Sequence, residues 1–167
     1  MLENEYAKVV GRSIDAEARV SAGLEAVSLA TPFPTANPLA SQLQAVARLI
    51  GARSALGAKR QVFMVSLGGF DLHDNLLGRQ PALMGQVSDA LAAFHQATAE
   101  LGVADKVTAF TASDFGRTLT SNGDGSDHQM VRAPTVVGAA AARGRLRSAT
   151  CRSRSSVSLA ARRMAGS

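Results

Sequence analysis

The chain has 167 residues, of which 46% are hydrophobic and 4% are aromatic. This length provides one domain with a core, or part of a larger domain, and the apolar fraction excludes wholesale disorder. A single cysteine, Cys151, excludes an internal disulfide and a cysteine-rich zinc module. The net charge of +5 is unevenly distributed, with −3 over residues 1–127 and +8 over residues 128–167.

Residues 1–5 are acidic where a signal peptide is basic, and no apolar run follows them. We therefore expect no signal peptide and, for the chain as written, a cytoplasmic location. No segment reaches the roughly 18–20 apolar residues that a membrane span needs. The basic charge comes from arginines within residues 132–163, and no aromatic residue lies among them to stack on bases. We expect neither a membrane span nor a nucleic-acid partner.

Two helices are predicted first in the chain. Apolar residues recur at three- and four-residue steps over residues 3–29, which predicts an amphipathic helix. A Pro-containing loop follows. Asn37 and Pro38 then form a helix start, because an Asn side chain accepts free amide hydrogens and Pro suits the first turn. This second helix is expected over residues 38–54.

A strand, a helix and a second strand follow. Residues 62–65 are continuously apolar, which predicts a strand buried on both faces. Pro81 begins a helix that Gly102 ends. The β-branched segment at residues 107–111 predicts another strand. This order indicates an α/β fold with at least one parallel βαβ unit.

The composition changes after His128. Residues 129–167 are rich in Ala, Arg, Gly and Ser and contain no acidic residue. Two explanations fit, a disordered basic arm or a change of reading frame in GC-rich DNA near the His128 codon. We rank the frame change higher. We expect residues 1–128 to form a partial α/β domain and residues 129–167 to be a disordered or frame-shifted tail.

Polar loops follow both predicted strands, and a third lies further on. Parallel strands would bring the loops at residues 68–75 and 113–118 to one sheet edge, where functional groups collect. Each of His73 and His128 lies near an Asp, in the first and third loops. Carboxylates and neutral imidazoles together are ligands for a divalent cation.

Each of these residues also has a purely structural interpretation. Asp71 can be a turn former that bonds its own backbone. Asp114 and Arg117 can form an ion pair across a tight turn. Asp124 is expected to shape its loop. His95, on the third predicted helix, is expected to be structural or partly exposed and not to be a ligand.

Taken together, the motifs are more specific than any one of them, and they resemble a known family. The resemblance is to the bacterial domain-of-unknown-function 1501 family, whose members are often exported by the twin-arginine route to the periplasm. It is close over about residues 35–128 and rests on motifs that occur in the family's order: Gly68-Gly69-Phe70-Asp71-x-His73, Ser113-Asp114-Phe115-Gly116-Arg117-Thr118, and Asn122 with Gly125-Ser126-Asp127-His128.

The resemblance implies a distant relation to the alkaline phosphatase and sulfatase superfamily, with a central sheet between helices. It implies that Asp71 with His73 and Asp127 with His128 are metal ligands. Asp114 and Arg117 would orient a small anionic ester substrate. The divalent metal would be zinc, manganese or calcium. Members are about twice this length, so the resemblance also implies a chain that is incomplete at both ends and lacks the nucleophile loop.

Two functions from different classes follow from this. The first is a metal-dependent hydrolase of the phosphatase or sulfatase type, of which this chain would be an inactive fragment with no catalytic residue of its own. The alternative is a non-catalytic binding protein, exported or surface-associated, with the same fold. The sequence carries no signal that specifies an oligomeric state.

Overall fold

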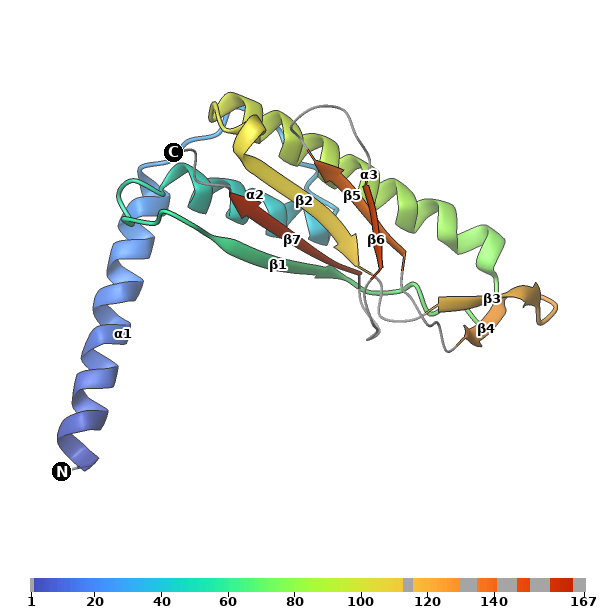
Figure 1. Cartoon of the computed structure of the whole chain (residues 1–167), viewed down its shortest axis with the longest axis horizontal. Helices are drawn as coiled ribbons and strands as arrows, with labels where there is room; N and C mark the ends of the chain where they lie inside the picture. The colour runs from blue at the N-terminus through green and yellow to red at the C-terminus, as the bar shows by residue number, and fades with distance from the viewer. Residues whose placement is uncertain (1, 113–115, 130–134, 141–146, 151–156, 164–167) are drawn as a thin grey trace.

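The computed structural model describes residues 2–112, 116–129, 135–140, 147–150 and 157–163. The fold is mixed α/β (Figure 1). The described helices lie in the first two thirds of the chain, and the strands form a five-stranded sheet and a separate two-stranded hairpin, with one sheet strand, at residues 62–67, between the helices. The helical elements are α1 (Leu2–Glu25), α2 (Pro38–Gly51), α3 (Leu76–Glu100) and the short 3₁₀ helix η1 (Ala104–Lys106). The strands are β1 (Val62–Leu67), β2 (Val107–Ala112), β3 (Gly116–Ser121), β4 (Ser126–Gln129), β5 (Thr135–Ala140), β6 (Arg147–Thr150) and β7 (Val157–Arg163).

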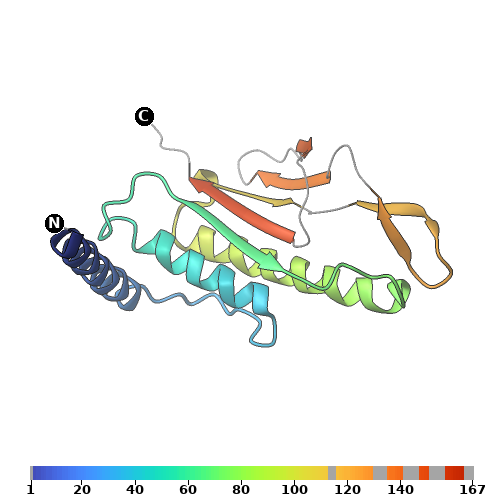
Figure 2. The same ribbon diagram turned by 90° about the horizontal axis from the view of Figure 1, so that it is seen from below.

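Helix α1 extends away from the rest of the molecule (Figures 1 and 2). Its apolar residues recur at helical spacing, as predicted, but the helix buries few of them. Tyr6 is 74% exposed and Ile14 is 61% exposed. The predicted amphipathic helix is therefore present, ending at Glu25, and its apolar stripe is open along most of its length.

Helix α2 begins as the sequence predicts. The Asn37 side chain accepts hydrogen bonds from the backbone amides of Leu39 (3.0 Å) and Ala40 (3.2 Å), which are two of the amides that a helix start leaves unpaired. Asn37 is itself buried, and its Nδ2 donates to the Gln86 carbonyl on α3 at 2.7 Å. The cap therefore also joins α2 to α3.

The five-stranded sheet has the order β1-β7-β2-β5-β6, and every pairing in it is antiparallel. The predicted strands at residues 62–65 and 107–111 are present as β1 and β2. They do not pair with each other, because β7 lies between them. Both are antiparallel to β7 and so run in the same direction. The strand–helix–strand order of the expected βαβ unit is present, but no parallel pairing joins its strands, because a later strand lies between them.

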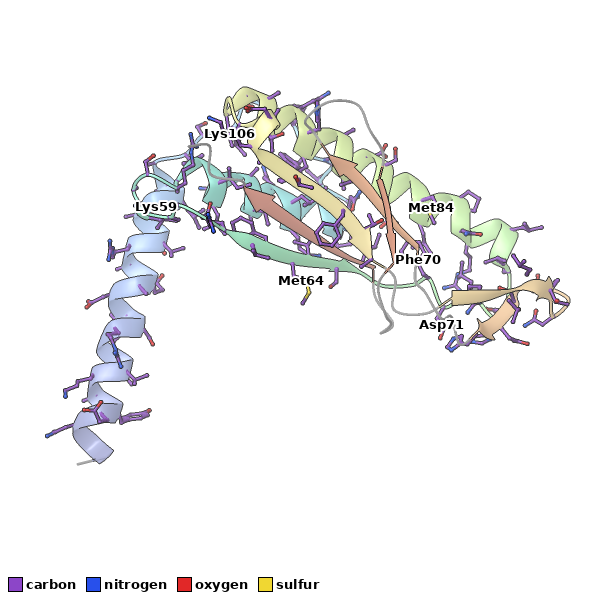
Figure 3. The ribbon with its side chains drawn as sticks, in the orientation of Figure 1. Lys59, Met64, Phe70, Asp71, Met84 and Lys106 are labelled. Atoms are coloured by element: carbon purple, nitrogen blue, oxygen red, sulfur yellow. The ribbon has the colours of Figure 1, made fainter. Side chains whose placement is uncertain are left out.

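Helices α2 and α3 cover one face of this sheet (Figures 1 and 2). Strand β1 alternates accordingly: Val65 and Leu67 are buried in the core, whereas Val62 and Met64 are 73% and 79% exposed. Met64 points away from the helices (Figure 3). The expectation of a strand buried on both faces, in a sheet between helices, is wrong for β1, because no described helix covers the second face.

The main core lies between the covered face and the two helices. It is built from aliphatic and small side chains with one phenyl ring, and its largest members are Leu39, Leu43, Ile50, Leu67 and Phe94. Alanines of α3 are fully or almost fully buried there, which allows α2 and α3 to approach closely.

Helix α3 begins five residues before the predicted start, so that Pro81 lies inside it. Its first turn is set by a contact that is distant in sequence, since the Leu76 amide donates to the Asp124 carbonyl at 3.0 Å. Asn75, just before the helix, has φ 45°, a left-handed conformation that Asn tolerates. The predicted end is confirmed: Gly102 follows the helix with φ 64°.

Strands β5, β6 and β7 place described parts of residues 129–167 in the sheet. Whether this segment is a tail in a changed reading frame stays a prediction. Among the described helices, none combines the length and apolar character needed to cross a bilayer.

Candidate metal centre

Two segments meet beside the start of α3 to form the site. One is the loop at residues 68–75, which follows β1. The other is the antiparallel hairpin of β3 and β4. Asp71 lies where the loop and the hairpin come together (Figure 3). The polar groups that the sequence places about 55 residues apart are therefore neighbours in space.

Three side chains converge on one another in this place. Asp71 Oδ1 lies 2.6 Å from His128 Nε2 and 3.0 Å from His73 Nε2. The two Nε2 atoms are 3.1 Å apart, and the imidazole rings are tilted by 34° with centroids 4.8 Å apart. All three side chains are about half exposed. We call Asp71, His73 and His128 the triad.

Arg117, on β3, fastens the hairpin to the loop. Its Nη1 donates to Asp71 Oδ1 at 2.8 Å, and its Nη2 donates to the Leu72 carbonyl. Its Nε donates to Ser126 Oγ at 3.2 Å. The side chain is only 19% exposed. Its planar group of donors is therefore directed at the protein itself.

Asp127 and Asn122 form the outer part of the site. Asp127 Oδ1 lies 3.4 Å from His73 Nδ1, the ring nitrogen that faces away from the triad's centre. Asn122 Nδ2 donates to the same Asp127 oxygen and to the His73 carbonyl, both at 3.1 Å. Asn122 lies in the hairpin turn, and its Oδ1 accepts the Gly125 amide at 2.8 Å.

The surroundings of Asp71 keep its carboxylate ionised. The hydrogen bond from His128 is the main cause that lowers the pKa of Asp71 below its ordinary value of 3.8, and desolvation opposes it. Electrostatic attraction to His128, the hydrogen bond from Arg117 and electrostatic attraction to His73 lower it further. Asp71 is therefore a carboxylate, the form that ligates metals, throughout the neutral pH range.

The three ligand atoms are spaced for a single ion. A triangle with edges of 2.6, 3.0 and 3.1 Å has a circumradius of about 1.7 Å, less than the roughly 2.0–2.2 Å of zinc–nitrogen and zinc–oxygen bonds. One ion could thus be held by all three residues together. Among the described residues, Asp71, His73 and His128 form the group with ligand atoms all within 4.8 Å of one another.

The structure brings most of the predicted site residues together. Asp71, His73 and His128 form the triad, and Asp127 touches it on its outer side. Arg117 lies against Asp71, but its contacts are with the protein. Asp114 lies outside the described residues. The sequence interpretation of His95 as a residue outside the ligand set agrees with its exposed position on α3.

Sequence reasoning overlooked the contributions of Asn122 and Ser126. The Asn122-Gly123 pair is a signal for a tight hairpin turn and could have predicted the β3–β4 hairpin. Gly123 has φ 115°, which a residue with a side chain rarely adopts. No local pattern indicates that Asn122 bonds to the His73 carbonyl, because that contact spans 49 residues.

The family described as "Protein of unknown function (DUF1501)" matches residues 7–159, which include the triad, Asp127 and the whole described sheet except the end of β7. The chain belongs to this family. The suspected DUF1501 membership is thus confirmed. No curated protein and no solved structure matches this DUF1501 chain.

Proposed function

We propose that this DUF1501 chain binds one divalent transition-metal ion through Asp71, His73 and His128. The observation that carries the proposal is the spacing of their three ligand atoms, which lie 2.6–3.1 Å apart. One carboxylate and two imidazoles match the three-ligand sets of catalytic zinc sites and of other transition-metal sites, which leave positions open for water or substrate. The exposure of the triad supplies such access.

The resemblance implies zinc, manganese or calcium, and these metals differ in how well they fit two nitrogen ligands and one oxygen ligand. Calcium takes six to eight oxygen ligands, whereas two of the three ligand atoms here are imidazole nitrogens. Zinc readily accepts nitrogen together with carboxylate oxygen, and manganese accepts them less strongly. We propose zinc first, manganese second and calcium last.

We further propose that the ion serves hydrolysis of a phosphate or sulfate ester, as the expected relation to alkaline phosphatases and sulfatases implies. A bound metal ion would lower the pKa of a water molecule or polarise an ester oxygen. In this proposal Asp71, His73 and His128 hold the ion, and Arg117 keeps the Asp71 carboxylate in place. Arg117, which lies against Asp71, would also orient the substrate anion, as the family resemblance implies.

The metal affinity of the protein tests the proposal that the triad binds an ion. Purified protein is stripped with a chelator and titrated with Zn²⁺, Mn²⁺ and Ca²⁺, and the bound metal is measured by mass spectrometry after dialysis. We expect one Zn²⁺ per chain, and a loss of affinity in Asp71→Asn and His128→Ala that exceeds the roughly 10–100-fold cost of removing an outer contact. His95→Ala removes an imidazole from α3, outside the triad, and is the matched control. Equal affinity in all four proteins would contradict the proposed site.

Metal content and turnover together separate the two functions. The zinc-loaded protein is assayed with p-nitrophenyl phosphate and p-nitrophenyl sulfate. Stoichiometric metal with little or no hydrolysis is the result expected for an inactive fragment of a hydrolase, and hydrolysis that disappears in His128→Ala would show an active one. A folded chain without stoichiometric metal would support the alternative, a non-catalytic binding protein.

A further inference from the structure

Asp127 does not lie where a metal ligand would lie, although the family resemblance implies that it is one. To be a ligand, Asp127 would need an oxygen atom beside the three ligand atoms of the triad, which are Asp71 Oδ1 and the Nε2 atoms of His73 and His128. Its Oδ1 instead lies 3.4 Å from His73 Nδ1. His73 uses its other nitrogen, Nε2, toward Asp71 and His128. The imidazole ring therefore stands between Asp127 and the position that the ion would take.

The hairpin holds Asp127 in this position. Asn122 Nδ2 donates to Asp127 Oδ1 and to the His73 carbonyl, so one amide group fixes both partners. The Asp127 amide donates to Thr118 Oγ1 at 3.2 Å across the hairpin. The carboxylate is thus fixed through its side chain and its backbone.

A close backbone contact sets the distance between hairpin and loop. A Cβ atom at Gly125 would lie 2.5 Å from the carbonyl carbon and oxygen of His73, so that only glycine permits this approach. The backbone at Gly125, just before β4, therefore approaches His73 more closely than a residue with a side chain could. This contact brings Asp127 and His128 to opposite sides of the same imidazole.

We propose that Asp127 is a positioning residue that accepts the Nδ1 hydrogen of His73 and so presents the Nε2 lone pair to the ion. The inference rests on the proposed metal site and assigns Asp127 to its outer shell. A neutral imidazole carries one hydrogen, and the partner of one nitrogen determines which nitrogen is free to ligate. Carboxylates in this position orient metal-bound histidines in many proteins.

Two measurements test the proposal, both on metal-loaded protein. In Zn²⁺-loaded protein, ¹H–¹⁵N NMR of the His73 ring follows the hydrogen on Nδ1. We expect this hydrogen to exchange slowly with water in the wild type, because Asp127 accepts it, and to exchange faster in Asp127→Ala. In Co²⁺-loaded protein, Asp127→Ala should raise Kd about 10–100-fold and leave the wavelengths of the Co²⁺ absorption bands unchanged at saturation, because the donor atoms are the same.

Asp124→Ala is the matched control, since it removes an exposed carboxylate from the same hairpin while the backbone atoms of residue 124 keep their contacts. It should leave both the exchange rate of the Nδ1 hydrogen and Kd unchanged. Shifted Co²⁺ bands in Asp127→Ala would show that Asp127 is a ligand and would overturn the proposal, as would an exchange rate that Asp127→Ala does not change. A wild type that binds neither metal would refute the metal site itself and this proposal with it, whereas a wild type that binds metal but leaves the Nδ1 hydrogen in fast exchange would refute the role of Asp127 alone.

Discussion

Asp71 Oδ1 is the atom on which the charged groups of the site converge. It lies within 3.0 Å of nitrogen atoms from His128, Arg117 and His73. These donors come from the loop after β1 and from both strands of the hairpin. One carboxylate oxygen thus links three parts of the chain, and its loss would affect both the proposed ion and the docking of the hairpin.

Glu100 plays a comparable structural part at the other end of α3. An acidic side chain in the last turn of a helix is unfavourable for the helix dipole. The hydrogen bonds of Glu100 offset this unfavourable interaction. Its Oε1 accepts the Ala30 amide at 2.7 Å, and its Oε2 accepts the Thr31 amide at 2.9 Å and the Thr31 hydroxyl at 2.6 Å. Glu100 therefore anchors the segment that connects α1 to α2.

These contacts predict a pH dependence of stability. The Thr31 hydroxyl first, and then the Ala30 and Thr31 amides, lower the pKa of Glu100 below its ordinary value of 4.5. A lowered folded-state pKa means that the carboxylate stabilises the fold above about pH 4.5 and that this contribution is lost as the pH falls through the folded-state pKa. Glu100→Gln should therefore be less stable than the wild type at pH 7, and the difference should shrink toward pH 3.5 in urea unfolding. A difference that is independent of pH would contradict this account.

At the scale of elements, the sequence predicted the helices and strands whose limits are set by residues close to them in the chain. Helix α2 was predictable because Asn37 and the apolar spacing act within a few residues. The early start of α3 was not, because the Leu76 amide is paired by Asp124, 48 residues away. The hairpin was expected as loops, although Asn122-Gly123 carried its signal. The convergence of Asp71 with His128 was expected from parallel strands but is produced by the hairpin.

The Asn37 cap of α2 predicts how substitutions at this residue change the stability of the protein. Asn37→Ala removes Oδ1, the acceptor of both cap hydrogen bonds, and leaves the Gln86 carbonyl without its Asn37 donor. We expect it to lower the free energy of unfolding by about 1–3 kcal/mol. Asn37→Ser keeps a cap oxygen but is too short to reach Gln86, so it should cost less than Asn37→Ala. Urea denaturation followed by circular dichroism measures both, and equal stability of the two variants would show that the cap contributes little.

At the scale of the whole molecule, the charge distribution is the feature that local structure does not explain. Eight arginines and no acidic residue fall in residues 128–167, after a stretch with net charge −3. The DUF1501 match runs on to residue 159, so an uninterrupted reading frame is the competing account. The strand order could not be predicted, because it depends on which distant segment pairs between β1 and β2.

The reading-frame hypothesis can be checked on the gene. We predict that translation past the His128 codon in one of the other two frames yields a Gly-rich continuation with an aromatic residue soon after Asp127-His128. Resequencing of the region would show whether a base is missing or added. If neither alternative frame contains such a continuation, the hypothesis is wrong and the arginine-rich segment belongs to the protein.

His73 and His128 lie 55 residues apart in the chain, yet their ring nitrogens are neighbours. An ion held by both would act as a removable cross-link that closes this long loop. Since a ligand that binds the folded chain stabilises it in proportion to the logarithm of its concentration, each tenfold rise in free metal above Kd would add about 1.4 kcal/mol. The melting temperature of the protein would then serve as a gauge of the metal supply around it.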